Sequence, residues 1–73
     1  MSDFTAIFLV TDTQTGAESF EKHHIRAKSM HDAVNIAEML CKMALRGNKQ
    51  FVECSTGYMS DDEFNDYMEL LSA

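Results

Sequence analysis

The chain has 73 residues, no proline or tryptophan, and no apolar run long enough to cross a membrane or to serve as a secretory signal. We therefore expect one domain over residues 1–73, starting at a native Met1 and located in the cytoplasm. The net charge of −6 is uneven, because residues 60–73 carry five carboxylates and no basic side chain, whereas residues 1–59 have a net charge of −1. Such an acidic patch repels nucleic acid and attracts basic surfaces, including surfaces that bind DNA or RNA phosphates.

A strand and a turn open the chain. Residues 4–11 are rich in β-branched and aromatic side chains and are apolar on both alternating faces, which is typical of a central or doubly covered strand. Residues 12–17 break this pattern and predict a hairpin loop, with Gly16 at a position that requires a positive φ.

The second predicted strand covers residues 18–27. Its apolar positions change parity between Phe20 and Ile25, so the two side chains would point to opposite faces of a regular strand. Either a bulge near residues 22–24 or an edge strand with one solvent-exposed face would account for this change.

The longest apolar pattern predicts a helix from Ser29 to Gly47. Ser29 can cap it by accepting from the backbone N–H of Asp32, and Gly47 suits the left-handed residue after the last turn. A stripe with helical spacing is expected to cover one face of a sheet; it consists of Ala33, Val34, Ala37, Leu40, Cys41, Ala44 and Leu45.

More apolar residues lie on this helix than one sheet face can cover. They predict either core filling or an adaptable binding surface, and they slightly favour a homodimer over a monomer. These marginal residues are Met30, Ile36, Met39 and Met43.

A third strand is predicted over residues 50–58. Simple alternation would place Phe51 and Cys54 on opposite faces, and Gly57 marks the exit from the strand. The segment Ser60 to Glu63 then forms a capping box that begins a short helix.

The apolar positions of this last helix form a narrow edge that could dock on the domain, with Met59 and Phe64 placed as a hydrophobic staple. The order strand, strand, helix, strand, helix predicts an α+β domain, ββαβα. In it a three-stranded sheet carries the long helix on one face and is followed by a short acidic C-terminal helix.

No group of residues predicts catalysis. Cys41 lies in the apolar stripe, where a thiol is desolvated and unreactive, and it pairs with Cys54 only in the alternative that the two form a core disulfide rather than free thiols. His23 and His24 are neighbours in a strand, so at most one of them can join a metal cluster. The C-terminal carboxylates lack EF-hand spacing. We expect a non-enzymatic protein with no cofactor and no metal.

Lys22, His24 and Arg26 share one strand face with Phe20, an arrangement that could stack single-stranded nucleic acid. Only one aromatic side chain takes part and the chain as a whole is acidic. A small single-stranded nucleic-acid-binding or adaptor domain is therefore an alternative, and direct nucleic-acid binding is not favoured.

Residues 27–33, Ala-Lys-Ser-Met-His-Asp-Ala, and residues 60–68, Ser-Asp-Asp-Glu-Phe-Asn-Asp-Tyr-Met, carry a resemblance in layout. With the hairpin and the third strand, they resemble small phage-encoded inhibitors of the anti-CRISPR type or the phage inhibitor of host RNA polymerase. The resemblance implies an acidic nucleic-acid mimic, in the host cytosol if a phage encodes it, that blocks the basic groove of a nucleic-acid-handling bacterial complex.

The rigid acidic helix is the predicted contact surface for such a protein partner, with Tyr67 and Phe64 as apolar anchors if they are not buried. Its partner-binding residues are expected to be Asp61, Asp62, Glu63, Asp66, Tyr67 and Glu69.

Overall fold

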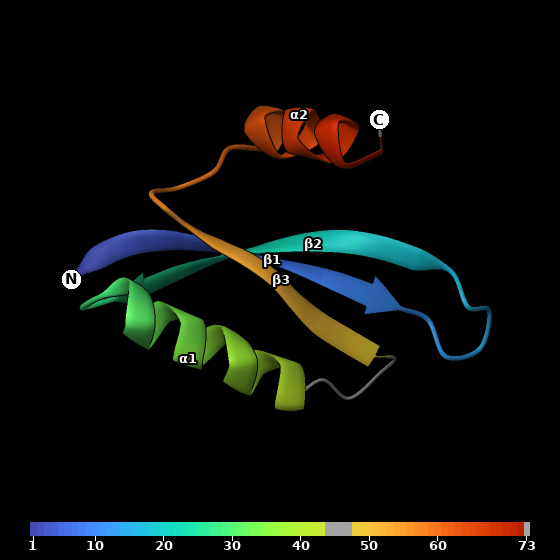
Figure 1. Cartoon of the computed structure of the whole chain (residues 1–73), viewed down its shortest axis with the longest axis horizontal. Helices are drawn as coiled ribbons and strands as arrows, with labels where there is room; N and C mark the ends of the chain where they lie inside the picture. The colour runs from blue at the N-terminus through green and yellow to red at the C-terminus, as the bar shows by residue number, and fades with distance from the viewer. Residues whose placement is uncertain (44–47, 73) are drawn as a thin grey trace.

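The computed structural model describes residues 1–43 and 48–72 and shows a three-stranded antiparallel sheet between two helices (Figure 1). The strands are β1 (Ser2–Thr11), β2 (Glu18–Ala27) and β3 (Asn48–Thr56), and the helices are α1 (Met30–Lys42) and α2 (Asp61–Ser72). The predicted α+β order ββαβα is confirmed. None of the helices in the described part of the chain is long and apolar enough to span a membrane.

β1 is the central strand of the sheet, whose order is β2-β1-β3. This confirms the prediction from its two apolar faces, because both faces of β1 are covered: Phe8 is fully buried on one side and Ile7 is 1% exposed on the other. The hairpin loop that follows is also as predicted. Gly16 adopts a φ of 75°, and its N–H donates to the Asp12 carbonyl oxygen at 2.8 Å.

The parity change in β2 is explained by its position at the edge of a sheet that is covered on both faces. β2 pairs with β1 without interruption from Ser2 opposite Ala27 to Thr11 opposite Glu18, so the expected bulge near residues 22–24 is absent. Phe20 lies opposite Leu9 on one face, and Ile25 lies opposite Phe4 on the other. Each apolar side chain of β2 therefore meets a different layer of the molecule.

The bulge is found in β3 instead. Ile7 pairs with Glu53 while Phe8 pairs with Phe51, which leaves Val52 as the extra residue. The prediction that Phe51 and Cys54 point to opposite faces is therefore wrong, and both pack against the same hydrophobic core. The physical reason is that a bulge shifts the alternation by one residue.

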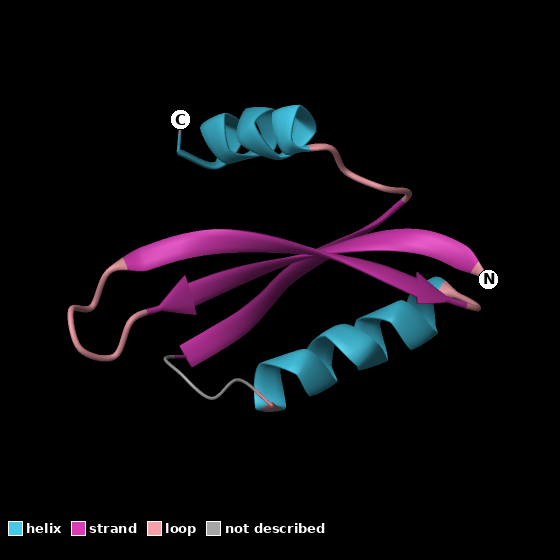
Figure 2. Cartoon of the chain, turned by 180° about the vertical axis from the view of Figure 1, so that it is seen from behind, coloured by secondary structure: helices cyan, strands magenta, loops and turns pink. Residues whose placement is uncertain are grey.

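α1 covers the face of the sheet that we call the α1 face, defined by Phe4, Ala6 and Phe8 of β1 (Figure 2). Ala33 and Ala37 are fully buried against it, so the helix backbone lies close to the strands. Partly buried side chains complete this core: they are Met30, Leu40, Cys41, Phe51 and Cys54.

The start of α1 is as predicted, whereas its end is earlier. Ser29 is the N-cap, and its hydroxyl accepts from the Asp32 N–H at 3.2 Å. The helix ends at Lys42 with Met43 as its C-cap, whose N–H donates to the Met39 carbonyl oxygen. The predicted continuation through Ala44, Leu45 and Arg46 to a Gly47 cap lies outside the described residues.

Candidate partner-binding surface

α2 lies on the side of the sheet opposite α1, over the face that we call the α2 face, defined by Thr5, Ile7 and Leu9 of β1. The chain reaches it through Gly57, whose φ of 88° turns the backbone away from β3. This turn confirms the prediction that Gly57 marks the exit from the strand.

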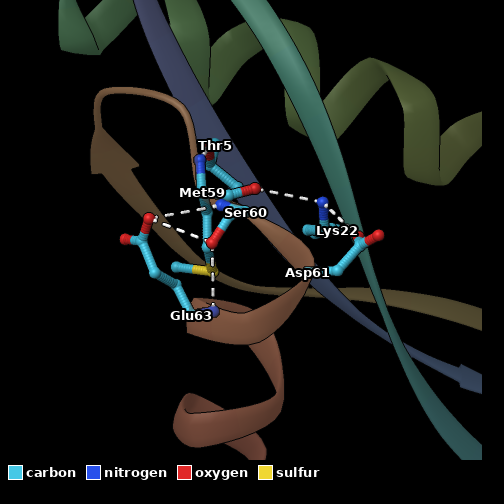
Figure 3. Close-up of polar contacts among 6 residues, drawn as sticks. All are labelled: Thr5, Lys22, Met59, Ser60, Asp61 and Glu63. Carbon is cyan, nitrogen blue, oxygen red and sulfur yellow. Dashed lines mark hydrogen bonds and ion pairs between the residues drawn. The ribbon is translucent and has the colours of Figure 1, made fainter.

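The linker between β3 and α2 is held by a buried hydroxyl. Thr5 is 1% exposed, and its Oγ1 donates to the Gly57 carbonyl oxygen at 2.8 Å. The same oxygen accepts from the Met59 N–H at 3.1 Å (Figure 3). The Gly57 N–H donates to the Asp3 carbonyl oxygen at 2.8 Å. Because these bonds satisfy backbone groups on both sides of Tyr58, the point where α2 begins is fixed relative to β1.

Lys22 of β2 reaches across the same face. Its ammonium donates to the Met59 carbonyl oxygen at 3.0 Å and forms an ion pair with Asp61 at 2.9 Å, and it lies 5.3 Å from the centre of the Tyr58 ring. The Lys22 side chain is only 18% exposed. The hydrogen bond with Asp61 raises the pKa of Lys22 against the opposing effect of desolvation, so this cation stays charged and engaged.

The capping box at the start of α2 is formed as predicted. The Ser60 hydroxyl accepts from the Glu63 N–H at 3.2 Å, and Glu63 Oε1 accepts from the Ser60 N–H at 3.4 Å (Figure 3). Met59 and Phe64, the residues of the expected hydrophobic staple, are both half-buried. Glu63 therefore holds the helix terminus together.

Tyr67 faces the sheet and not the solvent. Its hydroxyl donates to Glu53 Oε2 of β3 at 2.5 Å. This hydrogen bond, together with burial and the negative charge of Glu53, raises the pKa of Tyr67 to about 12. Phe64 and Met68, on the same edge of the helix, are half-buried. Tyr67 and Phe64 are therefore partly covered on this edge of α2, and their role as apolar anchors for a partner stays a prediction.

The predicted contact residues divide into two groups. Asp61, Glu63 and Tyr67 have partners inside the molecule, whereas Asp62 and Asp66 are exposed and form no ion pair within residues 1–43 and 48–72. Glu69 is exposed as well, and the spacing 62, 66, 69 places the three carboxylates along the outward side of the helix. We call Asp62, Asp66, Glu69 and Leu70 the acidic face.

Leu70 is the residue of the acidic face that the sequence analysis missed. It is 77% exposed and follows Asp66 by four positions, so it lies beside the carboxylates and not on the docked edge. The helical spacing contained this signal, because Leu70 falls outside the predicted apolar edge of Phe64, Tyr67, Met68 and Leu71. Of that edge, Leu71 is 46% exposed.

The basic face of β2, which was considered above as a surface for nucleic acid, is paired with acidic side chains of the protein itself. His24 Nε2 lies 2.8 Å from Asp3 Oδ1, and the same oxygen lies 3.5 Å from Arg26 Nε. With Lys22 paired to Asp61, all three basic residues have partners. This arrangement leaves no free row of cations for a phosphate backbone on β2.

His23 points to the opposite face, as expected for a neighbour of His24 in a strand. Its ring packs edge-on against Phe8 at 5.1 Å between centroids, and its Nε2 lies 3.3 Å from Glu21 and 3.4 Å from Lys49 Nζ. Burial acts to raise the pKa of Glu21, but the hydrogen bonds with Lys49 and His23 outweigh it and lower that pKa. The cluster joins β2 to β3 across the end of the α1 face.

The two cysteines are free and half-buried, so the disulfide alternative is excluded. Burial raises the pKa of both thiols, against a smaller opposing effect of Lys49 at Cys41, and a thiol in this state is a poor nucleophile. Over the described ranges, no group of three or more His, Cys, Asp or Glu side chains is placed to hold a metal ion.

Comparisons with protein-family models, with curated proteins and with solved structures gave no match for this chain.

Proposed function

We propose that this protein is a small acidic inhibitor without enzymatic activity, which uses the acidic face of α2 to occupy a basic nucleic-acid groove on a larger bacterial complex. The observation that carries the proposal is the way α2 is mounted: its inner side is bonded to the sheet, and on its outer side the exposed carboxylates of Asp62 and Asp66 form no ion pair within residues 1–43 and 48–72. An anti-CRISPR-like phage protein is the form of this function that we favour, and an inhibitor of host RNA polymerase is the alternative within the same class.

The geometry supports a mimic of a phosphate backbone. Asp62 and Asp66 are four residues apart, and a helical rise of about 1.5 Å per residue spaces them about 6 Å along the axis. Thr5, Lys22 and Glu53 each bond to α2 or to its linker, so the array is held before any partner binds. A preorganised array loses less conformational entropy on binding than a flexible acidic tail does.

Leu70 supplies the apolar contact area that the carboxylates lack. An exposed ion pair contributes little free energy in physiological salt, about 0–1 kcal/mol, so the acidic residues set the orientation and the association rate. An apolar side chain that is 77% exposed on the same face can be buried by a partner and can slow dissociation. The proposed site therefore combines Asp62, Asp66 and Glu69 for recognition with Leu70 as the anchor.

The test uses two matched charge variants in a pull-down from bacterial lysate, with the retained proteins identified by mass spectrometry. Asp62→Asn with Asp66→Asn neutralises the acidic face, and Glu18→Gln with Glu38→Gln removes the same charge from exposed positions elsewhere. We expect the parent and the control variant to retain the same nucleic-acid-handling complex, whereas the Asp62/Asp66 variant releases it at low salt. Equal retention by all three proteins would contradict the proposal.

A further inference from the structure

The outer side of α1 borders a hollow of about 360 Å³ between the first half of the helix and the end of β2. Its apolar floor is formed by Met1, Ile36 and Met39, which are 81%, 37% and 59% exposed. Arg26 and Lys28 line it from the β2 side, and Asp32 lies on the helix side. We call this hollow the α1 groove.

The side of the groove next to β2 carries positive charge. Lys28 is exposed and has no ion-pair partner in the part of the chain that the structure describes. Arg26 also lines the groove, but it belongs to the β2 face of Lys22 and His24 and its Nε lies 3.5 Å from Asp3, so Lys28 is the cation that the groove offers. An apolar floor beside this cation fits an amphipathic segment that carries a carboxylate next to an aliphatic side chain.

The acidic face of α2 has this chemistry. Leu70 stands one helical turn after Asp66, and Asp62 stands one turn before it. A hollow of about 360 Å³ has room for a single leucine side chain. The chain thus contains two exposed surfaces of opposite charge, each with an apolar part that is left open.

We propose that the α1 groove binds the acidic face of a second copy, with Leu70 of one copy on the Ile36 and Met39 floor of the other and Asp66 beside Lys28. The two surfaces cannot meet within one molecule, because α1 and α2 lie on opposite sides of the sheet (Figures 1 and 2). The contact is therefore heterologous, and copies associate head to tail and not through a two-fold axis.

This arrangement differs from a symmetric dimer through the methionines of α1, the alternative that the exposed Met39 and Met43 also suggest. In a symmetric dimer two α1 grooves would face each other and bring the Lys28 side chains of two copies near each other, whereas a contact between the groove and α2 pairs opposite charges. A small contact of this kind is weak, so association is expected at about 100 µM and above. It also covers the acidic face, so a copy bound in this way cannot bind another partner through it.

Mixing two complementary variants tests the proposal by sedimentation velocity, without any target present. Lys28→Glu disables the groove but keeps the acidic face, and Leu70→Asp disables the acidic face but keeps the groove. We expect the parent to associate at high protein concentration and each variant alone to remain monomeric. The equimolar mixture should form a heterodimer and nothing larger, because only one functional groove and one functional helix can meet.

Lys42→Glu is the matched control, since Lys42 is an exposed cation of α1 that does not line the groove. It should associate as the parent does. The proposal is overturned if the parent is monomeric at every concentration, if the mixture shows no heterodimer, or if Leu70→Asp associates like the parent while Met39→Lys does not. The last result would assign self-association to a symmetric α1 contact. No target protein is present in this experiment. A negative result here therefore does not decide the pull-down test of the proposed function.

Discussion

α1 and α2 cover opposite faces of one sheet, and they are attached to it by different kinds of contact. α1 is joined by close apolar packing, in which Ala33 and Ala37 are fully buried against a core that includes Phe8. α2 is joined by polar contacts at its start, where Thr5 and Lys22 bind its linker, and by the bond between Tyr67 and Glu53. The apolar residues on its inner edge are only half-buried.

The contacts of α1 and those of α2 therefore contribute differently to the stability of the domain. Apolar burial is the main favourable contribution to folding, and the larger apolar cluster lies on the α1 side of the sheet, so this side contributes more to stability. Polar contacts contribute less net free energy but define geometry, and they are found where α2 and its linker meet the sheet. We therefore expect substitutions on the two sides to have effects of different size and kind.

The largest effect is expected from Phe8→Ala. Phe8 is fully buried between β2, β3 and α1, and removing such a ring costs about 3–5 kcal/mol, against a free energy of unfolding of roughly 5 kcal/mol for a domain of this size. Chemical denaturation should show a domain that keeps no more than about 2 kcal/mol of its free energy of unfolding. Leu40→Ala, at a partly buried position of the same core, should cost about 2 kcal/mol, near the lower end for such a change.

Met39→Ala is the matched control for these core variants, because Met39 lies on the same helix but is 59% exposed. Its free energy of unfolding should change by no more than about 0.5 kcal/mol. If Met39→Ala destabilised the domain as much as Leu40→Ala, the outer side of α1 would be part of the core, and the contrast between the two sides of the helix would not hold.

A smaller and more local effect is expected from Thr5→Val. The substitution keeps the shape of the side chain but leaves the Gly57 carbonyl and the Met59 N–H without their partner, at a cost of about 1–3 kcal/mol. Amide exchange at Met59 should accelerate strongly while the amides of β1 and α1 stay protected. Thr11→Val at the end of β1 is the control, and comparable exchange at Met59 in both variants would refute the role of Thr5.

Local signals account for the parts of the fold that the sequence predicts well. The Ser29 cap, the Gly16 turn and the Ser60–Glu63 capping box each depend on residues within a few positions of one another, and all three are present. The β3 bulge at Val52 depends on how Phe51 meets β1 and α1, so alternation within the strand could not reveal it.

The candidate site could be predicted from the sequence only in part, because part of it depends on contacts between residues that are far apart in the chain. The charge of α2 is visible in the sequence, but which of its residues face the solvent depends on contacts from distant strands. Lys22 lies 39 positions before Asp61 and removes that carboxylate from the acidic face, and Glu53 turns Tyr67 inward. The exposure of Leu70 follows from this docking.

The smallest effect is a pH dependence of α2 docking through Tyr67. Because the folded-state pKa of about 12 lies above the ordinary value of 10.0, the neutral phenol is favoured in the folded protein. The stability that the Tyr67 to Glu53 bond contributes is then fully present below pH 10 and is lost as the pH rises from 10 toward 12. A phenolate cannot donate to the carboxylate, and it repels the carboxylate as well.

Ultraviolet titration of the Tyr58→Phe variant isolates the Tyr67 phenol and should give an apparent pKa of about 12. Adding Glu53→Gln should lower this value toward 10, because the variant removes the carboxylate that accepts the hydrogen bond of the neutral phenol and whose charge repels the phenolate. The free energy of unfolding of the parent should fall more steeply between pH 10 and 12 than that of Tyr67→Phe, which has no phenol at this position. Parallel curves for these two proteins would mean that the hydroxyl contributes nothing to docking, and the orientation of the acidic face would then depend on Thr5 and Lys22 alone.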